Sequence, residues 1–385
     1  MEQGGRRGLW RAAALALAAL AGPAGALAGP GGGGEIRLDM RARYEQVEQA
    51  DGREARAGTL RTRLGWGSPA WRGWSAYGEF EDVRLLLGLG GYAPREAGRA
   101  TVADPPLTQL NQAYLQWRGP RGLRVRLGRQ RILLDNHRFV GNVGWRQNEQ
   151  TFDALRLEAG PAPGLRLSYA YLERINGILP ELERKAADHL FHLAGRRGGL
   201  ALSLYAYLLR PEGGAGSETY GARLRGRWVR GPWRLPWTAE GATQRSPAGR
   251  AAYLLLEAGL ARGPWRLALG WERLGSDGGR YALQTPLATK HAFNGWADQF
   301  LATPAEGLRD LAITAGWRRG PLRLLAVHHR YRADRGGARY GSEWDLLLRR
   351  ALGRGRALGL KYAAYRAEGW RQDVDKLWLW GELRL

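Results

Sequence analysis

Short runs of alternating apolar and polar residues fill most of this chain. In residues 164–174 (GLRLSYAYLER), leucines and tyrosines take every second position, and Arg166 and Ser168 stand between them. Residues 219–229 (TYGARLRGRWV) and 264–274 (PWRLALGWERL) repeat this pattern. Alternation with a period of two predicts β-strands, and an apolar face opposite a face of charged or small residues is typical of strands that separate lipid from water.

The connections between these runs alternate in length. From Glu35 onward the pattern predicts about eighteen strands, a number within the range of outer-membrane barrels. Even-numbered strands end in tight turns such as RGPRG (118–122), whereas odd-numbered strands end in longer links. Short turns at one rim and long loops at the other are expected when the short turns face the periplasm, and a soluble sandwich or propeller gives no reason for them. The longer links include residues 84–108, 130–150, 174–188 and 275–307.

We therefore predict an all-β fold, a transmembrane antiparallel β-barrel of about 18 strands with inward-folded constriction loops. Residues 375–385 (DKLWLWGELRL) support it, because alternate residues are apolar and the chain ends on Leu385, as expected of a closing strand. Tryptophans close to turns predict girdles at the membrane interfaces, with ordinary packing as the alternative. They include Trp117, Trp228, Trp233, Trp265 and Trp317.

The N-terminus predicts export. Arginines flank the apolar run 12–21, and Ala26, Leu27 and Ala28 match the small-residue pattern of a cleavage site. We predict a signal peptide over residues 1–28 and one barrel domain over residues 29–385, located in the outer membrane after cleavage. A short membrane anchor is the alternative, but the apolar run falls short of the about 20 residues that span a bilayer.

Composition narrows the partners. The chain of 385 residues has 59 Lys and Arg against 36 Asp and Glu, a formal net charge of +23, and no cysteine. The lack of cysteine excludes disulfides, cysteine-bound zinc and thiol nucleophiles. The basic surplus predicts an anionic partner, and export argues against nucleic acid.

The sequence offers no enzyme motif. It has no HExxH, GxSxG or Walker pattern, and no GxGxxG between a strand and a helix. His189 and His192 are spaced so that a strand sends them to opposite faces, as are His328 and His329, which argues against metal pairs. We predict no enzyme activity, catalytic residue, metal or cofactor. A barrel enzyme with a serine and a histidine on its wall is the alternative, and no Ser–His spacing supports it.

If the apolar faces meet lipid, the opposite faces line the lumen. That wall is mixed in charge with a cationic surplus, which concentrates anions in a narrow channel. The alternative is that wall arginines and glutamates mainly pair with one another. The candidate wall residues are Arg124, Arg126, Arg156, Arg223, Arg225, Arg227, Glu79 and Glu81.

Residues 128–152 (GRQRILLDNHRFVGNVGWRQNEQTF) break the alternation. By parity they join the fifth strand to the sixth at the outer rim. A loop in water has no need of Phe139 or Trp145, and a buried one would not hold several arginines without partners. Both sets fit a loop that folds into the lumen, with apolar residues against the wall and polar residues toward the passage. Residues 285–308 have the same mixed character.

At these residues the chain resembles the alginate export family of Gram-negative outer-membrane barrels. The resemblance rests on residues 128–157 (GRQRILLDNHRFVGNVGWRQNEQTFDALRL) and 290–301 (KHAFNGWADQFL). It implies a lumen constricted by inward loops and lined by arginines that guide a polyuronate, a polymer with one carboxylate per sugar. The implied constriction residues are Arg129, Arg131, Asn136, Arg138, Asn142, Arg146 and Asn148, with Lys290, His291, Asn294 and Asp298 in the second loop.

Three functions are compatible with these observations. The first is passive, anion-favouring passage of an acidic polysaccharide or its oligosaccharides through weak arginine–carboxylate contacts. The second is a general or nutrient-uptake porin for small anions, and the third is a structural barrel or barrel enzyme without an open path. The expected partners are outer-membrane lipid and lipopolysaccharide, an anionic carbohydrate or small anion, and a periplasmic secretion partner.

Overall fold

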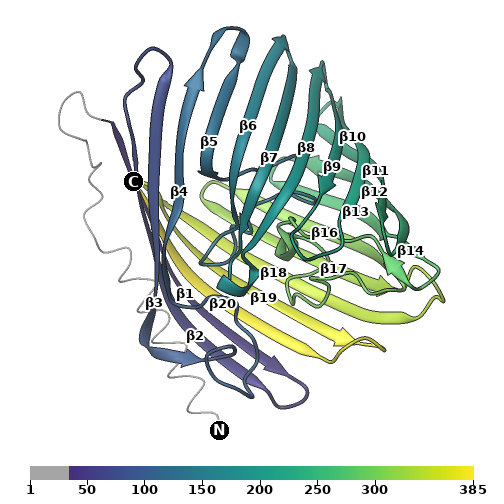
Figure 1. Cartoon of the computed structure of the whole chain (residues 1–385). Helices are drawn as coiled ribbons and strands as arrows, with labels where there is room; N and C mark the ends of the chain where they lie inside the picture. The colour runs from purple at the N-terminus through teal and green to yellow at the C-terminus, as the bar shows by residue number, and fades with distance from the viewer. Residues whose placement is uncertain (1–33) are drawn as a thin grey trace.

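Eighteen antiparallel strands form a closed barrel in the computed structural model, which describes residues 34–385 (Figure 1). The predicted signal peptide, residues 1–28, lies outside the described residues. The predicted all-β barrel is confirmed, and its strands follow chain order around the wall. They are β1 (Glu35–Gln49), β2 (Glu54–Gly67), β3 (Trp74–Gly91), β4 (Leu107–Arg118), β5 (Arg124–Gln130), β6 (Thr151–Ala162), β7 (Leu165–Asn176), β8 (Arg184–Arg197), β9 (Leu200–Leu209), β10 (Ser217–Arg230), β11 (Trp233–Ser246), β12 (Gly249–Arg262), β13 (Trp265–Leu274), β16 (Leu308–Arg319), β17 (Leu322–Arg332), β18 (Arg339–Gly353), β19 (Arg356–Ala367) and β20 (Val374–Arg384).

The barrel closes between the first strand and the last. β1 pairs with β20 from Asp39 opposite Arg384 to Gln49 opposite Val374. Near the end of this ladder, Leu385 N donates to Leu38 O over 2.8 Å, and Leu38 N donates to Leu385 O over 3.0 Å. Both ends of the described chain therefore lie at one rim.

That rim carries the tight turns, and we call it the short-turn rim. The opposite, long-loop rim carries the longer connections, including residues 131–150 and 275–307. β3 runs on to Gly91 rather than ending at Arg84, because its backbone keeps pairing with β2 although LLLGLGG has lost the alternation. The eight connections of the short-turn rim are residues 68–73, 119–123, 163–164, 198–199, 231–232, 263–264, 320–321 and 354–355.

The two faces of the wall differ as predicted. On the outer face Leu127 and Trp265 are 60% and 65% exposed, whereas Arg61 and Glu81 on the inner face are 2% and 0% exposed. Exposed apolar and buried charged side chains suit a wall with lipid outside. Trp378 of β20 departs from the girdle pattern: it is fully buried on the inner face, because both faces of DKLWLWGELRL are apolar and alternation alone does not orient them.

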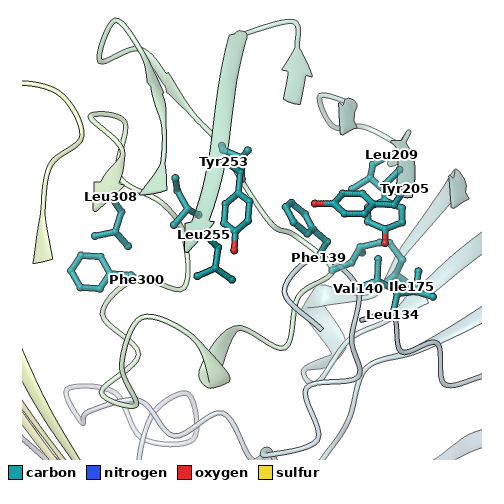
Figure 2. Packing of buried hydrophobic residues seen from close by; sticks show 14 of the residues in the cluster. Leu134, Phe139, Val140, Ile175, Tyr205, Leu209, Tyr253, Leu255, Phe300 and Leu308 are labelled. Atoms are coloured by element: carbon teal, nitrogen blue, oxygen red, sulfur yellow. The ribbon is translucent and has the colours of Figure 1, made fainter. Parts of the chain in front are cut away.

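The largest cluster of buried apolar side chains lies inside the barrel, between the wall and the connections. Figure 2 shows Phe139 of the 131–150 connection among tyrosines of the wall. Its ring lies 5.3 Å from that of Tyr205 on β9 and 5.2 Å from that of Tyr253 on β12. The connection thus folds into the lumen, as its mixture of apolar residues and arginines predicted.

Small elements complete the described residues. A hairpin of β14 (Ser276–Asp277) and β15 (Tyr281–Ala282) lies outside the barrel sheet. The short helical turns are η1 (Pro120–Gly122), η2 (Pro180–Leu182) and η3 (Lys290–Ala292). Within residues 34–385, no helix has the length and apolarity to cross a membrane.

Candidate functional site

Two connections meet inside the barrel. We call residues 131–150 the first insert and residues 283–307 the second insert. Val140 and Leu287 form a parallel bridge, Gly141 N donates to Leu287 O over 2.9 Å, and Thr289 N donates to His137 O over 3.0 Å. The inserts are therefore one unit, although more than a hundred residues separate them in the chain.

Arg146 ties this unit to the wall. Its Nη1 donates to Glu45 of β1 over 3.2 Å, and its Nη2 donates to Asp298 of the second insert over 2.6 Å. Burial disfavours the charged guanidinium, but the facing carboxylates of Glu45, Asp298 and Asp104 outweigh it and raise the pKa of Arg146. Arg146 therefore stays charged and paired inside the barrel.

Arg138 makes a second tie. Its Nε lies 2.8 Å from Glu272 of β13, its Nη2 donates to Asn294 over 2.9 Å, and its guanidinium sits over the Phe293 ring at 4.8 Å. Burial opposes its charge, yet Glu272 raises the pKa of Arg138. Asn294 also donates to Glu272 and Asp310, so the second insert shares this network.

His291 stacks on the ring of Trp145 and lies edge-on to that of Trp378, with ring centroids 5.3 Å and 5.6 Å away. Its Nδ1 is 2.7 Å from Asp298, and its Nε2 is 2.7 Å from Nζ of Lys361 on β19. A carboxylate at Nδ1 and an amino group at Nε2 favour a neutral imidazole with its proton on Nδ1. Burial in the first place holds the pKa of His291 well below its usual range, and Lys361 adds to this. The Lys361 ammonium lies 4.1 Å from the Trp145 ring and 3.8 Å from the Trp296 ring.

Glu149 accepts hydrogen bonds from three side chains at the edge of the first insert. Arg131 donates to it, Asn142 donates over 2.7 Å and Asn111 donates over 2.6 Å. Burial raises its pKa, but Arg63 and Arg131 prevail and lower the pKa of Glu149 to about 2. Arg131 also donates to Glu79 over 2.5 Å and is partly exposed.

The remaining residues of the two predicted loops lie apart from these networks. Arg129 is on β5, shares the outward parity of Leu127, and binds Asp153 of β6 over 2.7 Å. Asn136 accepts from the backbone N of Arg138, and Asn148 donates to Pro105 O over 3.0 Å. Lys290 is half-buried, and burial together with Arg184 and Arg138 lowers its pKa.

The candidate wall residues differ in whether they form ion pairs. Five of the candidates form ion pairs: Arg124 and Arg156 with Glu158, Arg223 with Glu240, Glu81 with Arg63 of β2 and Glu79 with Arg131 of the first insert. Arg126 instead donates to Gln116 over 2.8 Å and sits over the Tyr114 ring. Arg225 and Arg227 are exposed and make no ion pair within residues 34–385. Some of the candidate wall residues therefore pair with other residues of the wall, and others leave a positive charge without an ion-pair partner in the described part of the chain.

A row of arginines on β1 and β2 was missed in the sequence. A cavity of about 540 Å³ opens beside them, and we call it the arginine cavity. Arg41 and Arg61 stand directly opposite each other across the ladder, an arrangement of like charges that destabilises a sheet. The signal was present as arginine at alternate positions in RLDMRAR and RTR. The charged side chains that line the cavity are Arg37, Arg41, Arg61, Arg63, Arg131, Arg384, Glu35, Asp39 and Glu79.

Arg41 has no carboxylate among its hydrogen-bond partners within the described residues. Its Nε donates to Gln147 over 2.8 Å, and its other nitrogens donate to the carbonyls of Gly144 and Arg146 in the first insert. Arg61 binds Asp39, while its Nε is buried with no hydrogen-bond partner. The first insert thus forms one wall of the cavity and leaves it a cationic surplus.

A second lumenal cavity of about 440 Å³ lies under the other side of the first insert. Leu133, Leu134 and Asp135 of the insert face wall strands β6 to β10 across it. Its cationic lining repeats that of the arginine cavity and comprises Arg156, Arg166, Arg196 and Arg225.

No group of three or more histidines, aspartates and glutamates within residues 34–385 could hold a metal ion. His192 faces inward and binds Asp135 over 2.9 Å, whereas His189 contacts Tyr169 on the outer face, in agreement with the predicted split.

A family model described as alginate export matches residues 34–207. The resemblance to this family is thus confirmed over that part of the chain, which includes the first insert. No curated protein matches the chain.

Solved structures of outer-membrane channels share the fold. OccAB4 of Acinetobacter baumannii matches with a TM-score of 0.73 and 12% identity, covering 94% of this chain and 100% of its own. Two Pseudomonas aeruginosa structures match at 16% identity. OccK9 (OpdG) matches with a TM-score of 0.71, covering 91% of this chain and 97% of its own. OpdK with vanillate matches with a TM-score of 0.69, covering 91% of this chain and 98% of its own. The chain is an outer-membrane β-barrel with the fold of these channels.

Proposed function

We propose that this barrel is a passive, anion-favouring channel for an acidic polysaccharide or its oligosaccharides. The observation that carries the proposal is the arginine cavity, where Arg41 and Arg61 face each other beside an excess of further arginines. A guanidinium presents a fork of donors that fits a carboxylate. A ligand with a carboxylate on each sugar can move from one arginine to the next, because conduction needs several contacts that are individually weak.

Planar-bilayer recordings test this proposal. We expect oligouronates, and not neutral glucans of equal length, to block the current of the wild-type protein. The double variant R41Q/R61Q should bind the blocker about tenfold more weakly for each charge-assisted hydrogen bond that it removes. The matched control R84Q/R366Q removes two arginines from the outer face. Oligouronates should block its current as strongly as that of the wild type. High conductance without oligouronate block would reject the acidic-saccharide proposal.

Uptake of small carboxylates is the second candidate. OpdK, which shares this fold, has a structure with vanillate. Tyr77 and Tyr114 form an aromatic pair at 5.4 Å on the inner wall, with Arg126 4.2 Å over the Tyr114 ring. An aromatic acid can stack on such rings while an arginine holds its carboxylate. Block by vanillate together with indifference to oligouronates would favour this candidate over the first.

A further inference from the structure

Acidic residues are distributed unequally between the two rims. None of the eight connections of the short-turn rim contains Asp or Glu, whereas Arg72, Arg121 and Arg354 lie in them. At the long-loop rim, every connection except residues 247–248 contains at least one acidic residue. The short-turn rim is therefore the cationic end of the barrel.

Five arginines carry this charge onto the outer face. Each is the last residue of a strand at the short-turn rim or lies close to that end, is exposed, and shares the parity of outward apolar residues on its own strand. Each also stands across the ladder from a leucine or tryptophan; Arg230, for example, pairs with Trp233 and Arg262 with Trp265. We call Arg197, Arg230, Arg262, Arg319 and Arg350 the rim arginines.

The rim arginines lack acidic partners, unlike arginines at the other end of the same face. None of the five forms an ion pair within residues 34–385. At the long-loop rim, by contrast, Arg84 pairs with Asp82, Arg366 with Asp375, and Arg273 and Arg309 with Asp334. Arg262 instead lies 5.0 Å over the Trp233 ring, so its charge stays available beside an interfacial aromatic.

An apolar groove of about 680 Å³ lies on the outer face beside two of the rim arginines. Trp265 and Trp317, with ring centroids 6.3 Å apart, form one end of it. The small side chains of Ala315 and Ala326 lie between larger leucine side chains and leave room for the groove. Leu322, which also lines it, is cross-strand from both Arg319 and Arg350.

We propose that the short-turn rim binds anionic phospholipid of the surrounding leaflet, with phosphate groups on the rim arginines and an acyl chain in the groove below Arg319 and Arg350. Arginine binds phosphate through paired N–H donors, and anionic lipid surfaces attract basic residues. An arginine on the lipid face is tolerated only near the interface, where its cost is small. The outward direction of these side chains, among tryptophan and leucine, favours a lipid over an acidic protein in the periplasm.

Native mass spectrometry of the folded barrel, with an equimolar mixture of phosphatidylglycerol and phosphatidylethanolamine, tests the proposal. We expect the wild type to retain phosphatidylglycerol in preference. That preference should fall by about fivefold for each arginine removed in the series leading to R197Q/R230Q/R262Q/R319Q/R350Q. The five Arg→Lys substitutions should keep it, since they keep the charge.

A matched control removes five arginines that have acidic partners at the long-loop rim: R53Q/R84Q/R273Q/R309Q/R366Q. This control should retain the wild-type preference. Equal retention of both lipids by the wild type, or an equal loss of phosphatidylglycerol preference in the control, would overturn the proposal. Either result would favour an acidic protein as the partner of the cationic rim. Filling the groove with A326F should lower phosphatidylglycerol retention without a change of charge, and undiminished retention would refute the acyl-chain part. None of these residues lines the lumen, so block by oligouronates reports separately on the proposed function.

Discussion

Arg146 explains, at the scale of single residues, how a charged loop is kept in the interior of a barrel. Its three carboxylate neighbours come from β1, from the second insert and, through Asp104, from the β3–β4 connection. A buried charge is tolerated only when partners of this kind surround it. The loop arginines therefore serve first to hold the inserts in position.

Replacing Arg146 tests this role. R146A leaves Glu45 and Asp298 in the interior without their shared cation, and we expect a loss of about 3–5 kcal/mol in the free energy of unfolding. Circular dichroism during denaturant unfolding in detergent measures it. R84A removes an exposed ion pair and should change stability by about 0–1 kcal/mol. Equal effects of the two substitutions would contradict the structural role of Arg146.

His291 gives the interior a dependence on pH. Because its pKa is lower in the folded protein than in the unfolded chain, the unfolded chain binds the proton more tightly. Stability should therefore fall as the pH drops below about 6.5, the ordinary pKa of histidine. We expect H291Q to flatten the pH profile of the unfolding midpoint between about pH 7 and 5. H189Q alters an imidazole on the outer face, and its unfolding midpoint should change with pH as that of the wild type does. If the pH profile of H291Q also matched that of the wild type, the pH dependence would belong to another group.

At the scale of elements, the inserts show what sequence can and cannot give. Loss of alternation was enough to identify the inserts, because a strand pattern fails where the chain leaves the wall, and the mixture of apolar residues with arginines predicted that they fold inward. The residues that the inserts contact could not be predicted from the sequence, because they are far apart in the chain. Glu45 lies 101 positions from Arg146, and Asp298 lies 152 positions from it. Only the closed barrel brings such distant residues together.

The candidate residues themselves show the same limit. Arg129 stood beside Arg131 in the motif, yet parity places it on the outer face with Asp153, since β5 continues to Gln130. Arg41 and Arg61 were overlooked because each lies in an ordinary alternating strand, where arginine on the polar face draws no attention. Their cross-strand register, which like charges disfavour, is visible only in the folded sheet.

Removing the first insert tests what it contributes to the passage. Replacing residues 132–149 with a short Gly-Ser linker should raise single-channel conductance several-fold, because the segment occupies the lumen at the level of Tyr205 and Tyr253. The control replaces residues 212–215, an exposed connection between β9 and β10, with the same kind of linker. Unchanged conductance after loss of the first insert would mean that the narrowest point lies elsewhere.

At the scale of the whole molecule, a net charge of +23 is arranged rather than spread evenly. Part of it lines the two lumenal cavities and part surrounds the short-turn rim, while most carboxylates serve as partners inside or at the long-loop rim. Fields of this kind act over about 10 Å at 0.1 M salt and about 3 Å at 1 M. The proposed anion preference should depend on ionic strength accordingly.

Reversal potentials measured under a KCl gradient check this dependence. We expect clear anion preference around 0.1 M salt and a much weaker one around 1 M, because the Debye length shortens about threefold. R41Q/R61Q should show the smaller preference already at low salt. A preference that does not change with salt would point to selection by pore size or by tight binding instead.

The ladder between β1 and β20 also determines how the barrel can be assembled. Glu45 on β1 and Lys376 on β20 are joined through Arg146 and Asp298, one residue from each insert, with 3.0 Å between Lys376 and Asp298. Segments from the middle of the chain thus connect the first strand of the barrel to the last. Closure of the barrel and filling of its lumen therefore stabilise each other: the side-chain contacts of the inserts add to the backbone ladder, and that ladder protects two strand edges that would otherwise be open to pairing with other chains.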